Sequence, residues 1–242
     1  MIGTERQRAI LDYMKKHETI SVSQIVKKFY VSEATARRDL NVLEQAGSIR
    51  RVFGGATLVV GSDRQVPLFV REREDEREKS HIGERAATLI RDGQILFIDG
   101  SSTAQFLLPY LTSFKDLIVI TNGLKIAQAL GEMHIKVYST GGLLMENSSV
   151  LVGADAERFV DGFNADICFL SCKGLSDDGK FTDTSHSETL LRKKFLENAE
   201  TKVFLMTKNK LGRKYIHTLC HKEDVDYIVM DEDMPLVRVN AE

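Results

Sequence analysis

The chain has 242 residues with 43% apolar and 28% charged side chains, enough for one large or two modest domains with a substantial core. No apolar run approaches the roughly 20 residues of a membrane-spanning helix, and the charged start MIGTERQR is unlike a signal peptide. With three cysteines, these features exclude a disulfide-rich secreted scaffold and predict a cytoplasmic protein. Residues 1–57 carry ten Lys or Arg against six Asp or Glu, a charge of +4, whereas the remainder carries −6. That asymmetry is typical of a protein that binds DNA with one end.

The first thirty residues predict two short amphipathic helices. Capping boxes of the S/T-x-x-E/Q type begin at Thr4 and at Ser21, and each marks a helix start. The first helix is expected over about 5–17 and the second over about 22–29. Apolar residues at helical spacing face a core from both helices: Ile10, Leu11, Met14, Ile25, Val26 and Phe29.

A third helix is expected after the turn at Tyr30-Val31. Ser32 is a good N-cap, and Ala36, Leu40 and Leu43 recur at the spacing of a buried face. The opposite face carries small and polar side chains that can reach DNA phosphates or base edges. These side chains are Ala34, Thr35, Arg37, Arg38 and Asn41.

A short wing is expected to complete this module. Gly47 stands where a left-handed residue ends the third helix. Arg50 and Arg51 then lie on a strand before Gly54-Gly55. Three helices and a wing predict a winged helix-turn-helix bound to double-stranded DNA. The expected DNA contacts are Ser32, Ala34, Thr35, Arg37, Arg38, Asn41 and Arg51.

The stretch 31–56 resembles the N-terminal domain of DeoR-type bacterial transcriptional regulators. Their pattern runs roughly V-S-x-x-T-h-R-R-D-L-x-x-L-E-x-x-G-x-h-x-R-h-H-G-G-A, where h is apolar, and VSEATARRDLNVLEQAGSIRRVFGGA matches most of it. The chain departs at Ala36, where a larger aliphatic residue is usual, and at Phe53, where His is usual. Phe53 is therefore left out of the expected DNA contacts.

Residues 58–80 are expected to be a charged linker between the DNA-binding domain, residues 1–57, and a second domain, residues 81–242. The linker holds Pro67 and a dense charged run over 71–79, interpreted as a solvated helical face. Beyond it, apolar strands alternate with amphipathic helices, which predicts a mostly parallel, helix-covered α/β sheet. The expected strands are 95–98, 117–121, 135–139, 167–171, 203–206 and 227–230. The expected helices are 103–111, 124–130, 154–161 and 188–199.

Polar loops follow the expected strands, at the edge where parallel sheets bind ligands. Asp99–Thr103 follows the first strand and leads into a helix, so its amides and hydroxyls can bind an anion. Thr121–Gly123, Thr140–Gly142 and Lys173-Gly174 follow later strands, and Lys210–Gly212 comes near the end. Several such loops on one edge indicate a ligand site there.

The order of these motifs resembles the DeoR sensor domain, which is similar to ribose-5-phosphate isomerase. The resemblance implies a phosphorylated sugar or related metabolite as effector, with phosphate at Ser101–Thr103 and positive charge from Lys210. It implies that Asp99, Asn122 and Glu188 meet sugar hydroxyls. The expected effector residues are Asp99, Ser101, Ser102, Thr103, Asn122, Gly141, Gly142, Lys173, Glu188 and Lys210.

The leading prediction is a repressor of sugar uptake or catabolism genes, a homodimer or homotetramer, that a phosphosugar releases from DNA. Action as an activator stays open. One alternative is a sugar-phosphate isomerase with Glu188 as base and Asp99 and Lys210 assisting, which the basic N-terminal module disfavours. Another is an architectural DNA-binding protein without a ligand. No metal site is expected, because the cysteines lack C-x2-C spacing. No cofactor is expected either.

Overall fold

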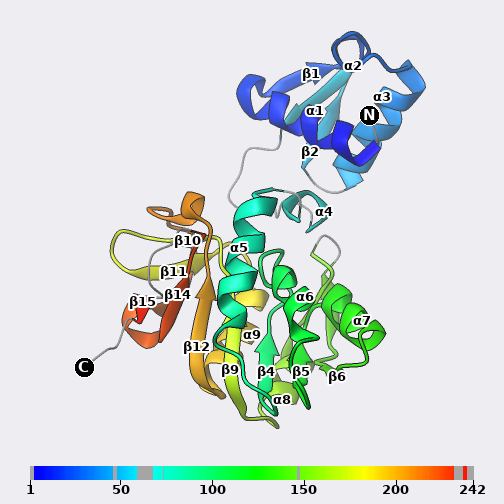
Figure 1. Ribbon diagram of the computed structural model, residues 1–242. Coiled ribbons are helices and arrows are strands. Elements are labelled where there is room, and N and C mark those ends of the chain that lie inside the picture. The colour runs from blue at the N-terminus through cyan, green and yellow to red at the C-terminus, as the bar shows by residue number, and fades with distance from the viewer. Residues whose placement is uncertain are drawn as a thin grey trace. The chain divides into compact units, whose positions relative to one another are not determined.

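The computed structural model describes residues 3–45, 48–58, 68–72, 74–145, 148–231 and 237–238. The chain divides between Arg71 and Glu72 into two compact units (Figure 1). The predicted domain limits at residues 57 and 81 stay predictions, and Gly47 and Pro67 lie outside the described residues. No helix of the described residues is long and apolar enough to cross a membrane.

The described residues of the first unit form four helices and a small antiparallel sheet in the order β1-β3-β2. Its elements are α1 (Gly3–His17), β1 (Thr19–Ser21), α2 (Val22–Phe29), α3 (Glu33–Gln45), β2 (Ile49–Val52), β3 (Gly55–Leu58) and α4 (Leu68–Arg71). Ile10, Met14, Ile25 and Leu40 are fully buried, as their helical spacing predicts. The predicted winged helix-turn-helix fold is therefore confirmed. The strand β1, which is too short to predict from alternation, pairs with β3.

The capping box at Ser21 is confirmed, and the one at Thr4 is wrong. Ser21 Oγ accepts a hydrogen bond from the Gln24 amide at 3.1 Å, and Gln24 Oε1 accepts one from the Ser21 amide at 2.7 Å. Thr4 instead lies inside α1, which already begins at Gly3. The helix therefore begins two residues before its predicted start at residue 5, which is the usual uncertainty of a helix end.

The second unit is built on a seven-stranded sheet in the order β15-β14-β12-β9-β4-β5-β6. All neighbouring pairs are parallel except β14 and β15. The sheet strands are β4 (Ile95–Ile98), β5 (Ile118–Thr121), β6 (Lys136–Ser139), β9 (Ala165–Leu170), β12 (Ala199–Leu205), β14 (Tyr227–Val229) and β15 (Val237–Arg238). The helices are α5 (Glu76–Ala87), α6 (Leu108–Leu111), α7 (Leu124–Glu132), α8 (Ala154–Val160) and α9 (His186–Glu197). The predicted parallel α/β sheet is confirmed.

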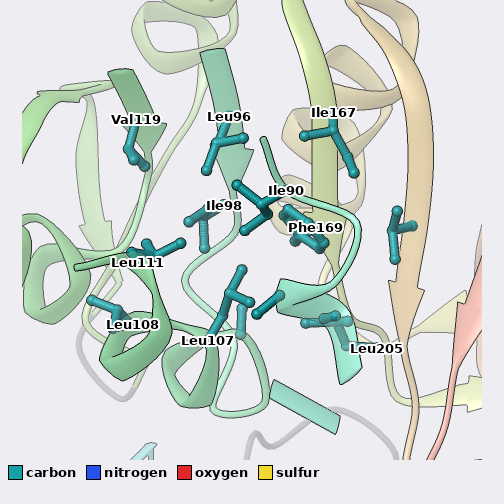
Figure 2. Close-up of a cluster of buried hydrophobic side chains, with 14 of the residues drawn as sticks. Ile90, Leu96, Ile98, Leu107, Leu108, Leu111, Val119, Ile167, Phe169 and Leu205 are labelled. Carbon is teal, nitrogen blue, oxygen red and sulfur yellow. The ribbon is translucent and has the colours of Figure 1, made fainter. Parts of the chain in front are cut away.

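Alternating side chains of the central strands pack into two separate cores, one on each face of the sheet. On one face, Ile98 of β4 and Phe169 of β9 pack against Leu107 and Leu111 (Figure 2). On the other face, Phe97 packs with residues of α8 and α9. Because both faces are covered by apolar groups, the central strands read as continuous apolar runs. The polar loops at their carboxyl ends are held by this double core.

Several short elements were not predicted. They are the hairpin of β7 (Leu143–Met145) and β8 (Val150–Val152), and the sheet of β10 (Gly174–Leu175), β11 (Lys180–Asp183) and β13 (His217–His221). The short 3-10 helices are η1 (Ala104–Leu107), η2 (Lys208–Lys210) and η3 (Lys222–Asp224). The helix predicted over 103–111 is thus η1 followed by α6. A strand of two to five residues carries too few alternations to be recognised from sequence.

Candidate functional site

The anion loop, Asp99–Thr103, follows β4 and is buried along its whole length. Its backbone is fixed internally, because the Ser101 amide donates to Asp99 Oδ1 at 3.1 Å and Ser101 Oγ accepts from the Ala104 amide at 3.1 Å. The loop thereby leads directly into η1. The hydroxyls of Ser102 and Thr103 remain available to meet groups from other parts of the fold.

Two lysines from distant parts of the chain meet these two hydroxyls. Lys79 Nζ of α5 lies 3.4 Å from Ser102 Oγ, and Lys210 Nζ of η2 lies 3.4 Å from Thr103 Oγ1. Lys210 Nζ also donates to Ser171 Oγ at 2.8 Å. Two ammonium groups beside adjacent hydroxyls make a positive site that suits an anionic group such as a phosphate.

A buried arginine joins the anion loop to α9. Arg192 Nε lies 2.7 Å from Asp99 Oδ2, Nη1 lies 3.0 Å from Asp183 Oδ2, and Nη2 lies 2.9 Å from Glu188 Oε2. Burial alone would lower the pKa of Arg192, but the charges of the three carboxylates outweigh it and raise that pKa above its usual value. Arg192 therefore stays charged and holds three carboxylates at the sheet edge.

Asp99 and Glu188 both belong to this Arg192 cluster. Asp99 is fully buried, and its Oδ2 also accepts from the Ser171 amide at 3.1 Å. Glu188 is fixed through the first turn of α9, where Ser185 Oγ accepts from the Glu188 amide at 3.3 Å. Their contact with sugar hydroxyls stays a prediction; the structure shows them fixing Arg192.

Asn122 bridges the anion loop and β8. Its Oδ1 accepts from the Gly100 amide at 2.9 Å, and its Nδ2 donates to the Leu151 carbonyl at 3.1 Å. A Cβ atom added to Gly100 would lie 2.2 Å from Val150 Cγ1 and 2.9 Å from Gly123 Cα. The glycines let the loops after β4 and β5 touch, and Asn122 sets their spacing.

The remaining expected residues lie on neighbouring turns. Gly141 and Gly142 have φ values of 66° and 102°, and a Cβ on Gly142 would lie 2.6 Å from the Val152 carbonyl oxygen. Lys173 follows β9, and its amide donates to the Thr182 carbonyl at 3.2 Å. The structure thus pairs Thr103 with Lys210 and the adjacent Ser102 with Lys79. Gly141 and Gly142 lie in the turn after β6, and Lys173 lies after β9. Their contact with an effector stays a prediction.

Sequence reasoning missed Lys79 and Asp183. Lys79 was assigned to a solvated charged face, yet its exposure is 3%. The signal that could have found it is helical spacing, since Lys79 precedes the buried Ile82, Gly83 and Ala86 by three, four and seven residues. Asp183 ends β11, a strand that was not predicted.

The described residues also contain two hollows apart from this group and two fully buried cysteines near it. A cavity of about 240 Å³ is lined by residues of α9, β12 and β13, and one of about 490 Å³ lies around the amino-terminal ends of β5 and β6. Burial raises the pKa of the Cys168 and Cys172 thiols to about 12, so neither acts as a thiolate at neutral pH. Among the described residues, no group of His, Cys, Asp and Glu is arranged to hold a metal ion.

The expected DNA-binding surface lies on α3 and the wing. Ser32 Oγ accepts from the Thr35 amide at 3.2 Å, which confirms Ser32 as the cap of α3. Ala34, Arg37 and Arg38 are exposed and Thr35 is half-buried. Side-chain contacts with DNA stay predictions, but the exposed face of α3 and its charge are compatible with them.

Two charged contacts hold α3 in place. Arg51 of β2 donates from Nη1 to Asn41 Oδ1 at 2.5 Å, so two of the expected DNA contacts bind each other. Asp39, on the opposite side of α3, is buried and lies 2.5 Å from Arg6 Nε of α1. The helix is therefore fixed to the wing on one side and to α1 on the other.

Comparisons with known proteins agree with both units. A model described as "DeoR-like helix-turn-helix domain" matches residues 6–60, and one described as "DeoR C terminal sensor domain" matches residues 74–232. The HTH-type transcriptional regulator GolR of Listeria innocua is 32% identical over 96% of this chain and 91% of its own length. The HTH-type transcriptional repressor GlcR of Bacillus subtilis is 31% identical over 96% of this chain and 89% of its own.

A third curated relative and one solved structure are also similar to the chain. The glycerol-3-phosphate regulon repressor of Escherichia coli is 27% identical over 98% of this chain and 94% of its own. Ribose 5-phosphate isomerase A of Methanocaldococcus jannaschii has a TM-score of 0.43 and 16% identity over 57% of this chain and 55% of that chain. The curated relatives are regulators of transcription, which disfavours the alternative prediction of an isomerase. The chain belongs to the DeoR family of DNA-binding transcriptional regulators, with a helix-turn-helix domain followed by a DeoR sensor domain.

Proposed function

We propose that the protein represses genes of sugar uptake or catabolism and leaves its operator when a phosphorylated sugar or related metabolite binds the sensor domain. The observation that carries this proposal is the pair of lysines at the anion loop. Lys79 and Lys210 place two ammonium groups beside adjacent hydroxyls, and Lys79 is almost fully buried. A bound phosphate would accept charge-assisted hydrogen bonds from both ammonium groups.

The polar part of a sugar would lie beside the same loop. Asp99 is the first residue of the anion loop, Glu188 is joined to it through Arg192, and Asn122 contacts the glycine of the loop. Carboxylates and amides are the groups that accept and donate hydrogen bonds to sugar hydroxyls. The names of relatives support a metabolite of this class, since one is a glycerol-3-phosphate regulon repressor.

The operator would be read by α3 and the wing of two copies. A homodimer or homotetramer presents two such modules to half-sites about one helical turn apart, or a multiple of that distance. Arg38, Asn41 and Arg51 would contact base edges or nearby phosphates, and Ser32, Ala34, Thr35 and Arg37 would line the same surface.

The first experiment is a thermal unfolding series. Full-length protein is heated with glucose 6-phosphate, fructose 1-phosphate, ribose 5-phosphate, glycerol 3-phosphate, their unphosphorylated counterparts and inorganic phosphate. A true effector at one hundred times its Kd should stabilise the protein by ~2.7 kcal/mol, whereas its unphosphorylated counterpart should not. The same compound should lower affinity for a duplex that the protein selects from a random library. If none of the phosphorylated compounds stabilised the protein, the phosphosugar proposal would be wrong.

A further inference from the structure

The second unit begins with a segment that is bonded to the loops of the proposed effector site. We call residues 72–79 the entry segment; its described residues are Glu72 and 74–79. It follows Arg71, the last residue of the DNA-binding unit. Any change in the sensor domain that reaches the DNA-binding unit along the chain must pass through this segment.

Three side chains of the entry segment contact residues that follow three different strands. Lys79 Nζ lies 3.4 Å from Ser102 Oγ, in the loop after β4. Glu72 accepts from Lys125 Nζ at 2.7 and 2.8 Å, at the start of the helix that follows β5. Asp75 Oδ2 accepts from Asn209 Nδ2 at 2.6 Å, in η2 after β12. The segment thus lies against the carboxyl edge at which the effector is proposed to bind.

Asn209 connects the entry segment to a proposed effector ligand. It is the neighbour of Lys210, and its Oδ1 accepts from Thr207 Oγ1 at 2.7 Å. The same side chain reaches Asp75 with its Nδ2. Because η2 is one short turn, a displacement of Lys210 toward a bound anion would move Asn209 as well.

Asp75 itself holds an uncommon backbone conformation. Its φ of 54° lies in the left-handed region, which non-glycine residues rarely adopt, and its carbonyl accepts from the Lys79 amide at 2.9 Å. The start of α5 therefore depends on its neighbours to keep this geometry. A residue held in this way can change conformation when one of its contacts is lost.

The middle of α5 also contacts η1, the short helix that follows the anion loop. A Cβ atom added to Gly83 would lie 2.1 Å from the Phe106 carbonyl oxygen, so α5 and η1 touch through their backbones. Close packing of this kind leaves no room for one helix to move independently. A shift of the anion loop is therefore passed to α5 by two routes, through η1 and through Lys79.

We propose that Asp75 and Asn209 are positioning residues that couple effector binding to release of DNA. This inference rests on the proposed function and names how the same site acts. An anionic effector draws Lys79 and Lys210 toward itself, the Asn209–Asp75 hydrogen bond changes, and the start of α5 takes a different conformation. Because the effector binds the two conformations with different affinity, it shifts their populations. Typical coupling of this kind is roughly 5–150-fold in affinity.

The test separates binding from coupling in the full-length protein. The panel of sugar phosphates named above and inorganic phosphate serve as probes, and the DNA is the duplex selected by the protein. We expect a saturating probe to lower wild-type DNA affinity at least tenfold. In the Asp75→Ala, Asn209→Ala double variant, probe affinity without DNA should stay within threefold of wild type, while the effect on DNA affinity should fall below twofold.

Asp161→Ala is the matched control, because it removes the Lys194–Asp161 ion pair of 3.1 Å, which is also partly exposed and lies outside the entry segment. It should keep the wild-type coupling. A double variant that binds the probe and releases DNA as the wild type does would overturn the coupling but leave the proposed function intact. Absence of any probe binding to wild type would overturn both.

A second measurement does not depend on variants. Amide hydrogen exchange of wild-type protein, with and without the probe that binds best, should change at residues 74–79. Unchanged exchange there, with protection at Ser102 and Thr103, would mean that the effector binds without reaching the entry segment, and the inference would be wrong.

Discussion

Asp99 and Arg192, 93 residues apart in the chain, are joined by a 2.7 Å ion pair that is almost completely buried. The same guanidinium binds Asp183 and Glu188, so one side chain connects the loop after β4, the end of β11 and the first turn of α9. Sites that sit on loops become precise only when something fixes the loops to each other. In this protein Arg192 fixes the loops to each other.

Replacing Arg192 by Met should leave three carboxylates buried without their cation. We expect the free energy of unfolding to fall by about 3–5 kcal/mol, as is usual when one partner of a buried ion pair is removed. Urea unfolding followed by circular dichroism measures this. Lys194→Met, on the same helix but with ion pairs that are open to solvent, is the control and should destabilise the protein much less. Equal losses in the two variants would show that Arg192 is not the centre of the cluster.

Asp39→Ala should destabilise the DNA-binding unit much more than Glu33→Ala. Asp39 is buried against Arg6 and Gln7, whereas Glu33 forms an exposed pair with Arg37 at 3.4 Å. The expected costs are about 3 kcal/mol for the buried pair and less than about 1 kcal/mol for the exposed one. Thermal unfolding of the full chain compares them. If Asp39→Ala unfolded at the same temperature as the wild type, the expected difference between the buried and the exposed ion pair would be wrong.

Arg38→Ala should weaken operator binding by ~1–3 kcal/mol if its exposed guanidinium reads a base edge. Fluorescence anisotropy with the selected duplex and with random DNA separates two roles. A loss confined to the selected duplex indicates base recognition. An equal loss on both, with a reduced dependence on salt, would instead identify a phosphate contact.

Ser102→Glu should leave DNA binding unchanged and abolish the response to a sugar phosphate. The new carboxylate would occupy the anion loop and repel a phosphate. Operator affinity with and without the effector measures both properties. Ser113→Glu, on the exposed turn after α6, is the control. A normal response in Ser102→Glu would place the phosphate elsewhere.

Periodicity predicted the helices of the first unit and the parallel strands of the second, because burial there leaves a strong pattern. Ile10 and Met14 recur at helical spacing, and β4 is an unbroken apolar run. The same logic failed for β11, since Lys180–Asp183 is polar and pairs with strands outside the main sheet. Asp183 was therefore missed with its strand.

Contacts between distant segments could not be predicted from the pattern of one segment. The charged run 71–79 suggested solvent exposure, but Lys79 faces Ser102 from the buried side of α5. The triple pairing of Arg192 likewise depends on three elements whose spacing is fixed only in the folded sheet. Resemblance to a family supplied candidate ligands, whereas the structure shows which of them bond to each other.

The two lysines beside the anion loop have a consequence for synthesis of the protein. The contacts that define the DNA-binding unit lie within residues 3–58, whereas Lys79 and Lys210 are 131 residues apart in the sequence. A growing chain, which folds from its N-terminus, presents a complete helix-turn-helix long before Lys210 has left the ribosome. The DNA-binding unit can therefore fold before the anion loop has both of its lysines, and the proposed effector site is complete only when the last third of the chain has been made.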